Sequence, residues 1–282
     1  MNMKLKAVLF GAADGGRRLY GEIAQRYEIL CYTDNDSQKW GKTLNEILIK
    51  EPSEALQEEW DDVIITSAPG CDSIYEQLRK EGVPEEKIIT RYVDAPLKSR
   101  IEFLKSLGKM MEKKNLEGAC AEAGVFQGDF AKHINEVYKN KKLYLFDTFC
   151  GFDSKDIVTE QQNNFSDSKE KDYSNASIEM VMNKMNYPEN CVVKPGYFPE
   201  TAKGIEEKFC FVNLDLDLYL PTLNGLWYFK DKMVSGGVIL IHDYFAENFR
   251  GPQKAVDEFM EDNTNLRVNP IGDGISVMIT GF

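Results

Sequence analysis

Residues 118–128, GACAEAGVFQG, carry the clearest fold signal in this chain. Its first half is a short apolar run typical of a buried parallel strand, and its second half is a glycine-containing turn before a helical pattern at 128–139. The next apolar run, 142–146, ends at Asp147, 25 positions after Glu122. In such turns glycines let the backbone approach a nucleoside, and a carboxylate at the next strand end binds ribose hydroxyls. The spacing predicts a Rossmann-like nucleoside site.

Further strand patterns continue downstream of this turn. They lie at 191–194, 209–214, 237–242, 266–270 and 276–280, and the sequence GDG at 272–274 between the last two is a hairpin signal. With 118–123 and 142–146 they predict a seven-stranded, mostly parallel sheet that ends in an antiparallel hairpin. The acidic, apolar-poor stretch 153–174 is long for a plain connection and predicts a mobile lid or a disordered insertion. Helical periodicity returns at 177–185.

A second alternation of strands and helices precedes this sheet. Strands are expected at 6–10, 27–33, 62–66 and 87–90, with helices at 17–27 and 72–81. They predict a smaller Rossmann-like α/β domain over 1–94 and a larger domain over 95–282. The boundary is expected at a turn near 92–96, before an amphipathic helix at 97–114.

The loop 11–16 after the first strand resembles a dinucleotide-binding turn. The match is loose, because Ala13 stands where the second glycine of that turn is expected. Asp34, at the end of the second strand, suits ribose hydroxyls. The loop is therefore either a cofactor site or a tight turn that has lost or changed its ligand.

Carboxylates follow two strands of the larger sheet. Asp215 and Asp217 come directly after the strand 209–214, while His242 and Asp243 end the strand 237–242. Open α/β sheets hold ligands at the carboxyl ends of strands, and three carboxylates with an imidazole suit a hard divalent cation, Mg²⁺ or Mn²⁺. The competing interpretation is that the aspartates cap the strand and His242 is a satisfied interior histidine.

This cluster bears on the choice of cofactor. The turn at 121–128 suits a nicotinamide cofactor as well as S-adenosylmethionine. A dehydrogenase does not ordinarily need a carboxylate cluster beside its cofactor, so the cluster favours S-adenosylmethionine.

Several stretches, in order, resemble the macrocin O-methyltransferase family over residues 115–282. They are EAGVFQG at 122–128, DTFCGF at 147–152, GYF at 196–198, DLDLY at 215–219, GG at 236–237 and DY at 243–244, with a further match at 251–259. The resemblance implies a class I methyltransferase fold, S-adenosylmethionine as methyl donor, and Mg²⁺-assisted methylation of sugar hydroxyls. More weakly, the front domain is similar to the Rossmann-like domains that begin bacterial sugar acyltransferases and some other sugar-processing enzymes.

Carried over motif by motif, the resemblance assigns roles to positions of this chain. The expected cofactor-binding residues are Glu122, Gly124, Val125, Phe126, Gly128, Asp147, Thr148 and Tyr197. The expected metal ligands are Asp215, Asp217, His242 and Asp243, and the expected catalytic residues are Asp215, Asp217 and His242, with the choice of base between the two aspartates open. The family usually has two adjacent acids where this chain has His242 and Asp243, a change that shifts cation preference from Mg²⁺ towards Mn²⁺.

The predicted function is S-adenosylmethionine-dependent O-methylation of a sugar hydroxyl, assisted by a divalent cation. Two alternatives stay open. The first is an NAD-dependent sugar oxidoreductase that uses the front domain and Asp34, although no Tyr-x-x-x-Lys pair supports hydride transfer. The second is a non-catalytic nucleotide-sugar binding protein with two binding domains.

Composition argues against other classes of protein. The chain carries 46 acidic and 34 basic residues, a net charge of −12, which disfavours nucleic-acid partners. Its apolar runs are far shorter than the ~20 residues of a membrane helix, and residues 1–6 lack the apolar stretch of a signal peptide. The six scattered cysteines predict reduced thiols. A cytoplasmic protein is expected, with no membrane partner, and a homo-oligomer is compatible with the sequence.

Overall fold

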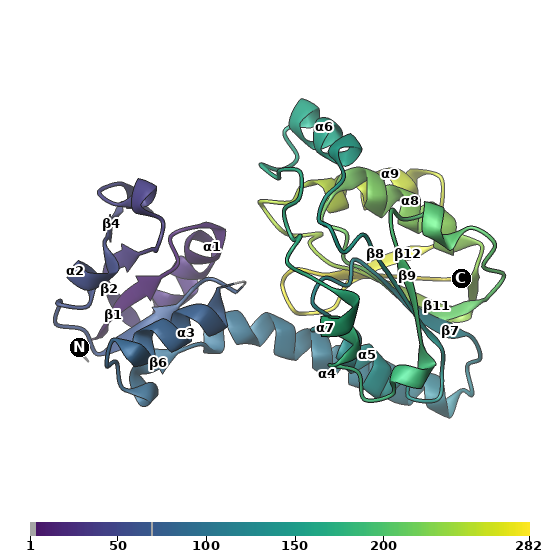
Figure 1. Cartoon of the computed structure of the whole chain (residues 1–282), viewed down its shortest axis with the longest axis horizontal. Coiled ribbons are helices and arrows are strands. Elements are labelled where there is room, and N and C mark those ends of the chain that lie inside the picture. Colours follow the sequence, from purple (N-terminus) through teal and green to yellow (C-terminus); the bar gives the residue numbers. More distant parts are fainter. Residues whose placement is uncertain (1–3, 69) are drawn as a thin grey trace. The chain divides into compact units, whose positions relative to one another are not determined.

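The computed structural model describes residues 4–68 and 70–282. Residues 1–3, which belong to the segment 1–6 that lacks a signal-peptide pattern, lie outside the described residues. The chain divides into two compact units, residues 1–98 and 99–282 (Figure 1). None of the described helices is both long enough and apolar enough to cross a membrane.

The first unit is built on a six-stranded sheet with the order β3-β4-β2-β1-β5-β6. Its strands are β1 (Leu5–Phe10), β2 (Tyr27–Thr33), β3 (Thr43–Leu44), β4 (Ile47–Lys50), β5 (Asp62–Ile65) and β6 (Ile88–Ile89), and its helices are α1 (Asp14–Ile23), α2 (Pro52–Ala55) and α3 (Cys71–Lys80). Strand β1 pairs in parallel with both β2 and β5, as in a Rossmann-like sheet. The sequence did not predict the antiparallel pair β3–β4, because strands this short carry no periodic signal.

Two glycines of α1 are expected to respond in opposite ways to alanine. A Cβ built on Gly15 would lie 1.9 Å from the carbonyl oxygen of Thr66, whereas one built on Gly21 would have no atom within 4 Å. Gly21→Ala should raise the free energy of unfolding by about 0.5–1 kcal/mol, because alanine favours the helix. Gly15→Ala should lower it by about 1–3 kcal/mol, because the overlap forces the backbone to shift. Thermal unfolding of the two variants measures this, and equal shifts would contradict the packing of α1.

The second unit is built on a seven-stranded sheet with the order β12-β13-β11-β10-β7-β8-β9. Its strands are β7 (Ala119–Ala123), β8 (Leu143–Asp147), β9 (Cys191–Pro195), β10 (Phe209–Leu214), β11 (Met233–Ile241), β12 (Arg267–Pro270) and β13 (Val277–Thr280). Only the pairings of β13, with β11 and β12, are antiparallel. The predicted seven-stranded sheet with a terminal hairpin is confirmed.

Helices cover both faces of this sheet (Figure 1). They are α4 (Arg91–Lys113), α5 (Ala131–Val137), α6 (Ser154–Asn163), α7 (Ile178–Met182), α8 (Tyr219–Lys230) and α9 (Gly251–Glu261). Along β7, Ala121 packs in a core cluster with Phe229 of α8 and Phe259 of α9. The adjacent Cys120 packs in a second cluster with Leu104 of α4. Burial on both faces explains why the strands read as continuous apolar runs.

Helix α4 corrects the expected turn at 92–96. The helix begins at Arg91 and runs through Pro96. The carbonyl of Thr90 accepts hydrogen bonds from the N–H groups of Val93 and Asp94, and Tyr92 and Val93 are buried in a core cluster of the first unit. Burial of these two side chains favours the helix, so tertiary packing prevails over the local turn signal.

Candidate active site

The site residues expected from the sequence lie at the carboxyl ends of the neighbouring strands β11, β10, β7 and β8, with Tyr197 after β9. Strand β10 lies between β7 and β11, where Leu214 pairs with Ala123 on one side and with Ile241 on the other. The N–H of Asp215 donates to the carbonyl of Ala123 at 2.9 Å. The turn after β7 therefore lies beside the carboxylates after β10 and β11, at the position where open α/β sheets hold their ligands.

Gly124 allows this close approach of the two strand ends. Its φ is +83°, and a Cβ on it would lie 1.7 Å from the carbonyl oxygen of Asp215. From the sequence pattern, this glycine is expected to let a ligand approach the backbone. The structure shows that the backbone of the neighbouring strand end already requires it.

Asp147 organises the turn after β7. Its Oδ2 accepts hydrogen bonds from the N–H groups of Val125 and Phe126, both at 2.8 Å, and its Oδ1 accepts one from Phe149 at 2.7 Å. A carboxylate has about four acceptor positions, so one remains for a ribose hydroxyl. Asp147 is therefore a structural element of the turn in addition to a candidate ribose ligand.

Three other expected cofactor residues make contacts within the protein. The hydroxyl of Thr148 donates to the carbonyl of Gly151 at 2.8 Å, and the hydroxyl of Tyr197 donates to Oδ1 of Asp156 at 2.8 Å. Gly128, with φ +81°, packs against Val181 of α7.

Asp215, His242 and Asp243 form a compact trio. Nδ1 of His242 lies 3.1 Å from Oδ1 of Asp215 and 3.0 Å from Oδ2 of Asp243. The three potential ligand atoms all lie within 4.8 Å of one another. Nδ1 is buried and, although close to both carboxylates, makes no hydrogen bond of good geometry with a described residue. Asp217, expected in the same set, is not part of this trio.

Neighbouring charges shift the pKa values of the residues in this cluster. Burial lowers the pKa of His242, but Asp215 and Asp243 outweigh it and raise this pKa to about 10. Burial raises the pKa of Asp215, but His242 and Arg100 hold it well below its usual value. Asp217 behaves differently, because burial and repulsion by Asp243 and Asp215 raise its pKa well above the usual value.

Two of these carboxylates sit on strained backbone. Asp217 and Asp243 have φ of +59° and +58°, in the left-handed region that non-glycine residues rarely adopt. Such conformations cost free energy, although aspartate adopts them more readily than most residues. Both aspartates therefore sit on costly backbone at the strand ends that carry the cluster.

Sequence reasoning missed a buried polar network beneath the trio. Nη2 of Arg100 donates to Oδ1 of Asn213 at 2.8 Å and to Oδ2 of Asp215 at 3.0 Å. Nδ2 of Asn213 donates to Oε1 of Glu122 at 2.8 Å, while Oε2 of Glu122 is buried without a described partner. Burial, followed by the charge of Asp215, raises the pKa of Glu122 well above its usual value. One sequence signal for this network is that Arg100 lies four residues before Leu104, which places a cation on the apolar face of the helix.

Tyr173 is a second missed residue. Its ring contacts Phe126 of the turn edge-on, with centroids 5.3 Å apart, and Phe152 with centroids 5.2 Å apart. Partial burial and the charges of Asp217, Asp243 and Asp215 raise the pKa of Tyr173. No local pattern in the acidic stretch 153–174 predicts the contacts of Tyr173 with these two rings.

That acidic stretch also carries helix α6. Asp156, Ile157 and Glu160 of this helix are buried, and the Glu160 carboxylate accepts a hydrogen bond from the N–H of Tyr219 at 2.8 Å. The expectation of a disordered insertion is therefore wrong for α6, because successive turns of this polar helix bury Asp156 against Tyr197 and Glu160 against the start of α8. Lid movement of this segment stays a prediction.

In the first unit, Asp34 occupies a position equivalent to that of Asp147. Its Oδ2 accepts hydrogen bonds from the N–H of Ala12 at 2.9 Å and from Nζ of Lys39 at 2.8 Å, and its Oδ1 accepts one from the N–H of Asp36. Burial opposes its charge, but these bonds lower its pKa. The carboxylate that best supported an NAD enzyme thus accepts three hydrogen bonds within the protein, as Asp147 does, and one of its three donors is the cation of Lys39.

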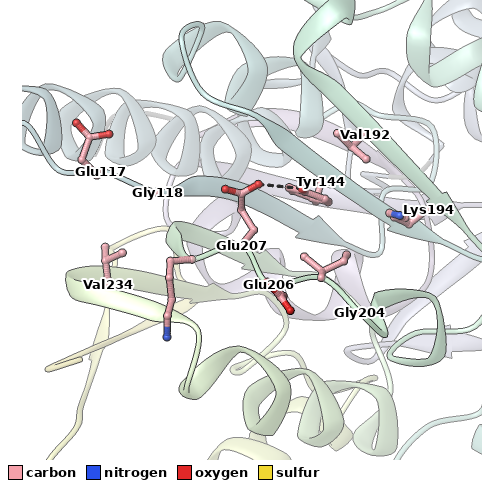
Figure 2. A pocket seen from close by; sticks show the side chains of 11 residues that line it. Glu117, Gly118, Tyr144, Val192, Lys194, Gly204, Glu206, Glu207 and Val234 are labelled. Carbon is pink, nitrogen blue, oxygen red and sulfur yellow. Dashed lines mark hydrogen bonds between the residues drawn. The ribbon is translucent and has the colours of Figure 1, made fainter.

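A surface pocket of about 740 Å³ lies at the amino ends of strands of the seven-stranded sheet, opposite their carboxyl ends (Figure 2). Gly118 before β7 and Lys208 before β10 line it, so it opens where these strands begin. Glu207 in this pocket accepts hydrogen bonds from Tyr144 and Lys142, both at 3.0 Å. The pocket contains none of the site residues expected from the sequence.

Comparisons with known proteins agree with this arrangement. The macrocin-O-methyltransferase (TylF) family matches residues 93–272, more than half of the chain, and a C2185-like N-terminal family matches residues 3–89. The solved structure of the O-methyltransferase NovP is 20% identical over 74% of this chain and 93% of its own, with a TM-score of 0.53. That of the calicheamicin methyltransferase CalS11 is 17% identical over 75% and 91%, with a TM-score of 0.55. These two likenesses show a shared fold. A search of curated proteins found no match.

Proposed function

Because this chain belongs to the macrocin-O-methyltransferase (TylF) family and is an O-methyltransferase that uses S-adenosylmethionine, we propose that it methylates a hydroxyl group of a sugar. The observation that carries the proposal is the trio of Asp215, His242 and Asp243 directly beside the turn that begins at Gly124. The end of β7 would hold the methyl donor, and the ends of β10 and β11 would hold the acceptor hydroxyl beside it. Methyl transfer requires the two groups to lie side by side in this way. We assign the activity to residues 95–282 and leave the domain at 1–94 as a separate unit.

The residues around the turn fit the methyl donor. The unpartnered Oε2 of Glu122 is buried at the start of the turn, and the positively charged amino group of S-adenosylmethionine would favour the ionised carboxylate and donate to this oxygen. Asp147 retains acceptor capacity for the ribose. The bound donor supplies an electrophilic methyl group, and the protein's part is to hold it and to prepare the acceptor oxygen.

The trio fits a divalent cation. Ligands at neighbouring corners of an octahedron, about 2.1 Å from the ion, lie roughly 3 Å apart, and Nδ1 of His242 lies 3.1 Å and 3.0 Å from the two carboxylate oxygens. The same Nδ1 is the buried atom without a hydrogen bond. We propose Asp215, His242 and Asp243 as ligands of Mn²⁺ or Mg²⁺. The cation, when bound, would lower the pKa of an acceptor hydroxyl.

We propose Asp217 as the base. Both oxygens of Asp215 face cations of the protein, Oδ1 towards His242 and Oδ2 towards Arg100, so this carboxylate is poorly placed to take a proton. Asp217 lies outside the trio, where burial and the charges of Asp243 and Asp215 increase its affinity for a proton, and a cation on the trio would keep its carboxylate ionised until it takes that proton. It would accept the proton of the sugar hydroxyl as the oxygen gains its methyl group.

The proposed acceptor is tested by methyl transfer to free sugars, glycosides and nucleotide-linked sugars. Transfer from labelled S-adenosylmethionine should add one methyl group to at least one of these acceptors, detected by mass spectrometry. The matched negative acceptor is the same compound with its hydroxyls already methylated. Transfer to phenols or catechols but to no sugar would contradict the proposal and leave the family assignment intact.

Cation binding is expected to release a proton from His242. With a pKa of about 10, the imidazole is protonated at neutral pH and must lose its proton before Nδ1 binds a cation. Below the pKa of His242, the proton competes with Mn²⁺ for Nδ1, so the affinity for Mn²⁺ should rise by up to about tenfold per pH unit as the pH increases. Calorimetry in two buffers of different ionisation heat measures the released proton. A His133→Gln variant should still release it, and pH-independent affinity would exclude His242 as a ligand.

A further inference from the structure

Arg100 is a buried cation that contacts Asp215, one of the proposed metal ligands. It lies on α4 with only 4% of its surface exposed, and its guanidinium lies 3.9 Å from the centroid of the Phe130 ring. Nη2 donates to both Asn213 and Asp215. A buried arginine is costly unless its charge is paired, so Asp215 is a fixed partner rather than an incidental contact.

This pairing divides the two oxygens of Asp215 between different tasks. Oδ2 accepts from Arg100 at 3.0 Å, whereas Oδ1 lies 3.1 Å from Nδ1 of His242, on the side of the trio. A carboxylate that is held in this way offers one oxygen to a cation. We propose that Arg100 is a positioning residue that restricts Asp215 to single-oxygen binding of the cation and thereby disfavours Ca²⁺.

The physical basis is the different coordination of the candidate ions. Mg²⁺, and Mn²⁺ with it, prefer six ligands in an octahedron, where one carboxylate oxygen occupies one corner. Ca²⁺ takes six to eight oxygens at longer distances and often binds a carboxylate through both oxygens. An arginine bond to Oδ2 therefore removes a ligand that Ca²⁺ would use and Mn²⁺ does not need.

The inference rests on the metal site of the proposed function, and the test separates the two. The preference for Mn²⁺ over Ca²⁺ is measured by displacing protein-bound Mn²⁺ with Ca²⁺ and following the electron paramagnetic resonance of free Mn²⁺. Removing the charge of Arg100 changes the attraction for both divalent ions alike, so the ratio of the two affinities isolates the geometry. A purely structural role for Arg100 would not move this ratio.

Arg100→Met should lower the preference for Mn²⁺ over Ca²⁺ by at least about fivefold, because both oxygens of Asp215 become free to bind. Arg100→Lys retains the charge without the planar fork and should fall between the unmodified protein and Arg100→Met. Lys109→Met, an exposed position on the same helix, is the matched control and should leave the ratio unchanged. An unchanged ratio in folded Arg100→Met overturns the role of Arg100 alone. Absence of bound Mn²⁺ in the unmodified protein overturns the metal site and this inference together.

A second measurement needs no substitution of Arg100. Infrared difference spectra between the Mn²⁺-loaded and Ca²⁺-loaded protein report how carboxylates bind, because the two stretching bands lie further apart for single-oxygen binding. The bands that disappear in Asp215→Asn belong to Asp215. Widely separated Asp215 bands with both ions support the inference, and two-oxygen binding of Ca²⁺ in the unmodified protein overturns it.

Discussion

Removal of divalent cations is expected to stop methyl transfer while S-adenosylmethionine stays bound. The cation is proposed to sit on Asp215, His242 and Asp243, whereas the methyl donor is proposed to bind the turn that begins at Gly124. Loss of hydroxyl activation should reduce the transfer rate by about a thousandfold. Calorimetry should show S-adenosylmethionine affinity changed by less than about threefold, because its proposed contacts lie on β7 and β8 instead.

Asp243→Asn should reproduce the effect of chelation, because an amide is a weaker cation ligand than a carboxylate. Added Mn²⁺ should restore the chelated protein at least as well as Mg²⁺, since His242 provides a nitrogen ligand. Asp231→Asn changes the same charge at an exposed position after α8 and serves as the matched control. Full turnover after exhaustive chelation would refute the metal role and leave a metal-free site, in which His242 is the cation between the two carboxylates.

Asp147→Ala is expected to weaken S-adenosylmethionine binding by at least about a hundredfold. The carboxylate accepts three backbone hydrogen bonds, from Val125, Phe126 and Phe149, and each bond to a charged group is worth about 1.5–3 kcal/mol. Its removal therefore loosens the turn in addition to deleting a candidate ribose ligand. Calorimetric titration with S-adenosylmethionine measures the loss.

Asp147→Asn separates these two contributions. Its amide oxygen keeps one acceptor for the turn but gives up the charge and the second oxygen, so affinity should fall less than in Asp147→Ala. Asp167→Ala, at an exposed position of the acidic stretch, is the control for loss of a surface charge. Unchanged affinity in a folded Asp147→Ala protein would place the cofactor elsewhere.

The contacts within the turn show why only part of the site was accessible to sequence reasoning. Gly124 and Asp147 were recognised because a strand, a turn and a following strand end leave a local pattern of residues. Their partners in the fold were not recognised, because Gly124 contacts the backbone of Asp215 and Asp147 binds N–H groups of the turn. The sequence therefore indicated the right residues but only part of what each of them does in the structure.

The two α/β units, the seven-stranded sheet and the family could be predicted from the order of residues along the chain. Buried parallel strands are continuous apolar runs, and motifs at strand ends are local, so both survive in a linear sequence. Three features became visible only in the folded chain: Arg100 contacts Asp215, Tyr173 contacts Phe126, and α4 begins at Arg91. These contacts depend on packing between elements distant in sequence or on the burial of Tyr92 and Val93. No local propensity encodes them, because their free energy appears only when the partners are brought together.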